Sequence, residues 1–394
     1  MILNYFNAKN LFLKKLSVLG SAIILLNLIN MVAWSQHYFI HISLYVFLLL
    51  LITLSILKDK NDDKLLLYIF LFALLWILTE PIKAWDARSI WFFHAKRIFI
   101  DNNLYAQLDG YADWSHNDYP PLLPSLAASI AKSFGFWNEY LPRISVLLAL
   151  FPILLILKWI FNNQLAFNLW VLGILITCKI SLINGHMDAL LAIYIATGCL
   201  LLSQIYLDTK NKSQYYFPLI LILSSLPLIK NEGLVATLIF MFLLMARINK
   251  ETLYVILSIL TLSIYLFFWK YHLILNSIHS DLFTSDILTK FTQRALNPED
   301  IVLIIKKVMK QLWFFLFIFF AFLIKNKKIE KITLIFICFI LAYLSAIFLV
   351  YMCSPYDLNW HLKSSIKRTM LPISVSILSM LIYLQFSFKS FLKK

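Results

Sequence analysis

Residues 188–206 read DALLAIYIATGCLLLSQIY, and the only charged residue in this stretch is the aspartate at its beginning. The hydrocarbon core of a bilayer is about 30 Å thick and needs roughly 20 apolar residues to be crossed by a helix. Inside lipid the backbone must satisfy its own hydrogen bonds, and an α-helix does so within a single segment. The stretch therefore predicts a transmembrane helix.

Eleven further segments have the same character, so the sequence predicts an all-α, polytopic transmembrane helix bundle of about 12 spans. We expect one domain that covers residues 1–394. The segments are 16–34, 39–57, 65–80, 143–160, 165–183, 216–229, 232–247, 252–271, 311–324, 331–351 and 371–388.

The composition supports this interpretation. The chain is 61% hydrophobic and 14% charged, with a mean hydropathy of +0.80. Soluble domains are about 45–50% apolar and about 25% charged. A soluble enzyme, a disordered protein and a disulfide scaffold are therefore excluded, and the four cysteines are far apart with no zinc-binding spacing.

The net charge of +15 indicates topology rather than nucleic-acid binding. With the N-terminus inside, 18 Lys and Arg residues fall in inside segments, while the short outside connections at 35–38, 184–187 and 230–231 contain only Lys230. Cytoplasmic loops carry such an excess of positive charge. We therefore expect both ends inside, and we interpret 120–136 as a helix at the outer surface, because a further span would invert this pattern.

Three long outer loops, 81–142, 272–310 and 352–370, are expected to form the active-site face, since long ordered loops usually carry function. Residues 87–101 have the pattern of an amphipathic interfacial helix. Asn297-Pro-Glu-Asp300 predicts a helix start, with a capping Asn, Pro at the first position and acids in the first turn.

Polar residues gather in five short clusters, all of which this topology places on the outer side. Each has a local explanation, such as a span end, a helix cap, a hairpin ion pair or an interfacial anchor. Because all five share one side, we expect them to form one cavity. Their key residues are Glu80 and Asp86; His116, Asp118 and Tyr119; Lys179 and Asp188; Lys230 and Glu232; and Trp360, His361 and Arg368.

The order of these motifs resembles the GT-C class of membrane glycosyltransferases, specifically the bacterial relatives of protein O-mannosyltransferases and lipid A aminoarabinose transferases. The resemblance covers most of residues 65–390, although two predicted spans precede the Asp-bearing loop where that family typically has one. The motifs are Trp85-Asp86, Tyr119-Pro-Pro-Leu122 with Gly135, Arg143, Asp188, Lys230-Asn-Glu-Gly233 and Trp360-His-Leu…Ser365…Arg368.

The resemblance implies a sugar donor carried on a polyprenyl phosphate in the bacterial cytoplasmic membrane, used on its outer face. The acceptor would be a lipid, a glycan or a protein. Basic groups at headgroup depth suit such a donor, and a carboxylate suits activation of an acceptor hydroxyl, with inversion at the anomeric centre.

Each candidate residue has an expected role. Asp86 is the expected base, with Glu80 as its alternative, and Asp188 orients the acceptor. The expected substrate-binding residues are His116, Asp118, Tyr119, Lys179, Lys230, Glu232, Trp360, His361 and Arg368. The sequence assigns no cofactor, but Asp86, Asp188 and His116 could hold a divalent ion such as Mg²⁺ or Mn²⁺.

Two other functions fit a polytopic chain of this kind. A flippase or transporter of lipid-linked oligosaccharides also has about 12 spans, but it tends to carry mid-membrane charges and internal repeats, which this sequence lacks. An O-antigen ligase or polymerase also uses lipid-linked sugars. Transfer from a labelled monosaccharide-phosphate lipid would distinguish the three.

Overall fold

The computed structural model describes residues 2–34, 64–207, 212–246, 249–278, 286–325 and 331–388. These residues are all-helical, as predicted, and contain no strand. The predicted span 39–57 lies outside them. The principal helices are α1 (Ile2–Ala33), α3 (Lys64–Thr79), α4 (Phe92–Asp101), α5 (Leu122–Phe134), α6 (Ile144–Phe161), α7 (Gln164–Cys178), α8 (Met187–Leu207), α9 (Ser213–Ile229), α10 (Asn231–Met245), α11 (Lys250–Leu262), α12 (Ile264–Leu275), α13 (Ile287–Ala295), α14 (Pro298–Lys325), α15 (Lys331–Cys353), α16 (Leu358–Thr369) and α17 (Leu371–Ile382).

Eight helical segments of the described chain are long and apolar enough to cross a membrane. Four shorter apolar helices accompany them: Leu66–Thr79, Leu122–Phe134, Ser213–Ile229 and Asn231–Met245. Three of these four correspond to predicted spans. The chain therefore has the architecture of a multi-pass membrane protein.

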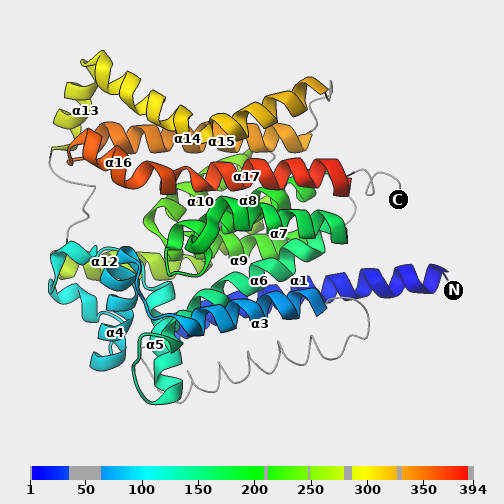
Figure 1. Cartoon of the computed structure of the whole chain (residues 1–394), viewed down its shortest axis with the longest axis horizontal. Coiled ribbons are helices and arrows are strands. Elements are labelled where there is room, and N and C mark those ends of the chain that lie inside the picture. The colour runs from blue at the N-terminus through cyan, green and yellow to red at the C-terminus, as the bar shows by residue number, and fades with distance from the viewer. Residues whose placement is uncertain are drawn as a thin grey trace.

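Most of the long helices run in roughly the same direction, and α4 and α5 cross this direction at one end (Figure 1). The start of α1 and the end of α17 both lie at the opposite end (Figure 1). We call the end that carries α4 and α5 the loop end, because the long connections gather there.

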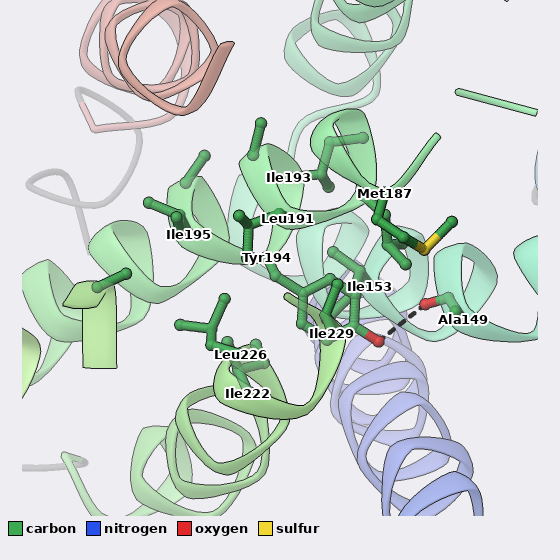
Figure 2. Packing of buried hydrophobic residues seen from close by; sticks show 14 of the residues in the cluster. Ala149, Ile153, Met187, Leu191, Ile193, Tyr194, Ile195, Ile222, Leu226 and Ile229 are labelled. Atoms are coloured by element: carbon green, nitrogen blue, oxygen red, sulfur yellow. Dashed lines mark hydrogen bonds between the residues drawn. The ribbon is translucent and has the colours of Figure 1, made fainter. Parts of the chain in front are cut away.

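Residues 188–206, with which the sequence analysis began, lie in α8 at the centre of the bundle. Helix α8 is buried from Met187 to Ile205 and packs on α6, α9, α15 and α17. Tyr194 lies among apolar side chains of α6, α8 and α9, and its hydroxyl donates to the Ala149 carbonyl at 2.9 Å (Figure 2). Apolar side chains gain little by leaving lipid for protein, so close packing and such bonds hold the helices together.

The structure refines two predicted elements and confirms a third. The helix predicted at 120–136 is present as α5, and it is buried from Leu122 to Ala131 against α1, α4 and α6. The predicted span 252–271 is interrupted at Ser263, between α11 and α12. The predicted helix start is confirmed, since α14 begins at Pro298 and Asn297 Oδ1 accepts from the Glu299 amide at 3.2 Å.

The outer loop predicted at 81–142 is largely helical. One π-helical turn, Ala87–Trp91, leads directly into α4, which matches the amphipathic segment predicted at 87–101. Trp34 at the end of α1 donates to Ser129 Oγ at 2.8 Å and so fixes α5 to the first helix. The loop is therefore a packed layer over the bundle.

Gly233 permits the tight connection between α9 and α10. A Cβ at this position would lie 1.9 Å from the Leu226 carbonyl oxygen, which is backbone and cannot move aside. We expect Gly233→Ala to cost about 3 kcal/mol of stability, because overpacking against backbone forces the hairpin apart.

The measurement is the melting temperature of purified protein in detergent. Gly173→Ala is the matched control, because its Cβ would meet only the tip of the Leu378 side chain. An equal loss in both variants would contradict the proposed constraint at Gly233.

Candidate active site

A cluster of charged side chains at the loop end is built on two anchored segments. Arg143, just before α6, donates from Nη1 to the Ile77 and Glu80 carbonyls, and from Nη2 to the Ile183 carbonyl at 3.1 Å. One guanidinium thus ties the segment that leads to Asp86 to the loop that leads to Asp188. These backbone oxygens are the ones left unpaired where α3 and the Lys179–Leu182 turn end.

Gly185 lets these two segments touch. Its φ of +89° lies in the left-handed region, and a Cβ would meet the Phe92 ring at 2.5 Å and Ala87 Cβ at 2.8 Å. A larger residue would therefore push the loop away from the turn that follows Asp86.

Asp86 and Arg368 form an ion pair between the first long loop and α16, as expected for one shared cavity. Both side chains are only partly exposed, at 22% and 32%. Tyr351 of α15 positions this part of α16, because its hydroxyl lies 2.9 Å from Ser365 Oγ and 3.0 Å from Thr369 Oγ1.

Lys230 forms the second ion-pair group, with two acids. Its Nζ lies 2.7 Å from Asp188 and 2.8 Å from Glu232, and all three side chains are at most 20% exposed. Burial favours the neutral amine, but the two carboxylates outweigh it and raise the pKa of Lys230 well above its usual value. Asp188 and Glu232 also lie in the first turns of α8 and α10, where helix dipoles favour negative charge.

Glu232 offers an acceptor to a ligand. Its Oε1 binds Lys230, whereas its Oε2 is buried without a hydrogen-bond partner among the described residues. Such an orphaned oxygen is costly in an apolar interior. A hydroxyl group of a bound molecule would satisfy it.

Asp118 and Tyr119 border the same cluster. Asp118 accepts from Asn231 at 2.8 Å, and Asn231 in turn accepts from Lys270 at 3.3 Å. Burial raises the pKa of the Tyr119 hydroxyl well above its usual value. The negative charges of Glu232, Asp118 and Asp188 also raise this pKa, whereas the positive charge of Lys230 lowers it. His116 stacks on Tyr119 with ring centroids 5.0 Å apart.

One cluster in the described chain could hold a metal ion. Ligand atoms of Asp86, His186 and Asp188 all lie within 4.8 Å of one another. Burial lowers the pKa of His186, which favours the neutral imidazole that ligates metals. The prediction named His116 as the histidine, but the structure places His186 beside the two acids.

Three of the predicted site residues lie outside the charged cluster. Glu80 pairs with Lys83 at 3.6 Å on the surface, so its carboxylate does not join Asp86. Trp360 is 58% exposed and packs on Tyr356, with ring centroids 5.5 Å apart. His361 is held by Ser354 Oγ at 2.7 Å and by the Tyr351 ring, and it supports the helix rather than the cluster.

Lys179 lines a separate apolar cavity of about 460 Å³ between α3, α6 and α7. The lining is hydrophobic apart from Lys179, which stands with Ile183 near the loop that carries His186. A cavity with apolar walls and one cation suits the chain and phosphate of an anionic lipid.

Three residues of the site, His186, Arg143 and Lys270, are not among the site residues predicted from the sequence. His186 had a signal, because it lies two residues before Asp188 in the same polar cluster. Arg143 was noted only through the family resemblance. Lys270 lies within an apolar segment, and nothing in its local pattern predicts the contact with Asn231.

Comparison with protein-family models, with curated proteins and with solved structures finds no match to this chain. The resemblance to GT-C glycosyltransferases therefore stays a prediction from the sequence.

Lys230 is the ion-pair partner of two acids with little exposure, Asp188 and Glu232, so its removal has a large expected effect. We expect Lys230→Met to lower the stability by about 3–5 kcal/mol, because two buried carboxylates lose their partner. The triple variant Lys230→Met/Asp188→Asn/Glu232→Gln should recover most of the loss. Melting temperatures of the purified proteins test this.

The control for this test is Lys83→Met, which breaks an exposed ion pair with Glu80 and should change the stability by less than about 1 kcal/mol. A triple variant as unstable as Lys230→Met would show that packing of the lysine, rather than its charge, carries the effect.

Proposed function

We propose that the chain is an integral membrane glycosyltransferase that uses a sugar linked to a polyprenyl phosphate. One observation carries the proposal: Asp86 and Asp188 lie in one cluster, and each pairs with its own cation, Arg368 and Lys230. This combination provides a carboxylate for an acceptor hydroxyl and cations for a phosphate. The apolar cavity at Lys179 supports the lipid part of the donor.

The proposed reaction begins with a change of partner at Arg368. The donor phosphate competes with Asp86 for the guanidinium, which binds phosphate through two parallel hydrogen bonds. Asp86 is then released to accept a proton from the acceptor hydroxyl.

In the transfer step, the acceptor oxygen attacks the anomeric carbon opposite the phosphate. The bond between the anomeric carbon and the phosphate oxygen breaks, and the electron pair leaves with the lipid phosphate. Arg368 and Lys230 stabilise the negative charge that develops there. The acceptor proton moves to Asp86, and attack from the opposite side inverts the anomeric centre.

We also propose a divalent metal ion at Asp86, His186 and Asp188. Two carboxylates and a neutral imidazole fit Mn²⁺ or Mg²⁺, with the imidazole favouring Mn²⁺. A bound ion would supply Lewis-acid stabilisation of phosphate charge.

For the topology, we propose about 12 spans with both termini inside and the loop end outside. The described ends of α1 and α17 lie on the same side of the bundle, which supports this arrangement (Figure 1). The membrane is proposed to be the bacterial cytoplasmic membrane, and the acceptor a lipid, glycan or protein on its outer face.

Asp86→Asn tests the proposed base. We expect transfer to fall at least about 100-fold, because an amide cannot accept the hydroxyl proton. The assay follows label from a polyprenyl-phosphate sugar to acceptors in membranes that contain the full-length protein.

The matched control for Asp86→Asn is Asp101→Asn, an acid of the same loop that pairs with Arg97 on the surface and should keep full activity. Full transfer by Asp86→Asn would reject Asp86 as the base. Movement of the intact labelled lipid without transfer would favour a flippase, and transfer only of whole repeat units would favour a ligase or polymerase.

Manganese binding gives a test that needs no activity. A ligand at about 100 times its dissociation constant stabilises the folded state by roughly 2.7 kcal/mol. We expect Mn²⁺ to raise the melting temperature of the wild type and of His116→Gln, but not of His186→Gln. Loss of the effect in His116→Gln alone would reject the assigned ligand set.

A further inference from the structure

A second cavity, of about 560 Å³, lies beside the turn that carries Asp86. Its walls come from the loop before this turn, from the turn itself and α4, and from Trp137 and Glu139. Ligand pockets of roughly 300–1,000 Å³ hold small organic molecules. None of its residues contributes to the charged cluster described above.

The cavity has an excess of positive charge. Lys83, Arg88 and Lys96 line it, against a single acid, Glu139. Lys96 lies 3.9 Å from Glu139, and both side chains are nearly half exposed, so this ion pair is loose. Arg88 has no ion-pair partner among the described residues, so its guanidinium is available to an anion.

Three aromatic side chains also line the cavity, and hydrogen bonds hold the loops that form it. Phe92, Phe93 and Trp137 line the cavity, and Trp137 donates to the Glu139 carboxylate at 3.1 Å. The Ile82 amide donates to the Glu139 carbonyl at 3.0 Å and ties the two loops together. Flat rings beside cations suit a molecule with an apolar ring face and a negative group.

The cavity adjoins the candidate active site. Arg88 follows Asp86 by two residues on the same turn, and the Phe92 ring is the group that a Cβ at Gly185 would strike. Phe92 therefore forms a wall of the cavity and also packs against the loop of His186. A molecule in the cavity would lie next to the charged cluster.

We propose that this cavity binds an anionic sugar, a hexose-sized ring that carries a phosphate or a carboxylate. The guanidinium of Arg88 and the amine of Lys96 bind the negative group, and Trp137 packs on the ring face. The anionic sugar belongs to the acceptor of the transfer reaction, an assignment that rests on the proposed transferase function.

The test measures binding to the full-length protein in phosphatidylcholine nanodiscs by titration calorimetry. The probes are glucose 6-phosphate, glucuronate, neutral glucose and inorganic phosphate. We expect both anionic sugars to bind at least about tenfold more tightly than glucose or phosphate. The double variant Arg88→Gln/Lys96→Gln should bind both anionic sugars at least about tenfold more weakly than the wild type, because it loses charge-assisted hydrogen bonds.

Lys290→Gln on α13 is the control for a lost positive charge outside the cavity and should bind both sugars as the wild type does. Trp137→Leu should weaken the sugars but not inorganic phosphate, which separates loss of the ring contact from misfolding. Unchanged affinity in Arg88→Gln/Lys96→Gln would overturn the proposal. Binding of inorganic phosphate as tightly as glucose 6-phosphate would also overturn it. Loss of sugar binding in nanodiscs that contain anionic phosphatidylglycerol would overturn it too, because the cavity would then bind a lipid headgroup.

Measurements of sugar binding and of transfer distinguish failure of the cavity proposal from failure of the transferase proposal. Asp86→Asn should bind both sugars normally while losing transfer. Sugar binding without any transfer in the wild type would reject the transferase and leave the cavity as an anionic-sugar site. Transfer without sugar binding would reject the cavity and leave the transferase.

Discussion

Lys230 holds the carboxylates of Asp188 and Glu232 at 2.7 and 2.8 Å, within a bundle whose helices are otherwise mostly apolar. Charged groups in such surroundings are stable only when they are paired. This requirement fixes the start of α8 against the α9–α10 hairpin. Together with the Asp86–Arg368 pair, the cluster has three acids and two fixed cations, so it keeps one surplus negative charge. The site is therefore electrostatically suited to a further cation.

Much of the architecture follows from composition and charge alone. The apolar segments predict the helices, and the placement of the clusters on one side predicts that Asp86 and Arg368 meet, although they are 282 residues apart. The ion pair between the two side chains confirms that prediction. The predicted start of α14 is also confirmed, since capping depends on neighbouring residues only.

Other features depend on tertiary contacts that no local pattern encodes. The charge pattern of the loops places residues 120–136 at a surface, yet α5 is buried in the bundle because Trp34, α4 and α6 cover it. The sequence ranks Asp86 above Glu80 by position only, and the structure separates them by their partners, because Asp86 pairs with Arg368 and Glu80 pairs with Lys83. His186 lies beside the two acids because Gly185 and Arg143 hold its loop there, and neither contact can be read from the local sequence.

The central position of α8 has a consequence for biosynthesis. Helix α8 emerges from the ribosome before α9, α15 and α17, which cover it in the finished bundle. Lys230 is synthesised 42 residues after Asp188, and Arg368 is synthesised 282 residues after Asp86. Because chains fold as they are synthesised, beginning with the N-terminal part, a nascent chain contains the acids before their counter-ions. The charged cluster can therefore be completed only when α16, which carries Arg368, has joined the bundle.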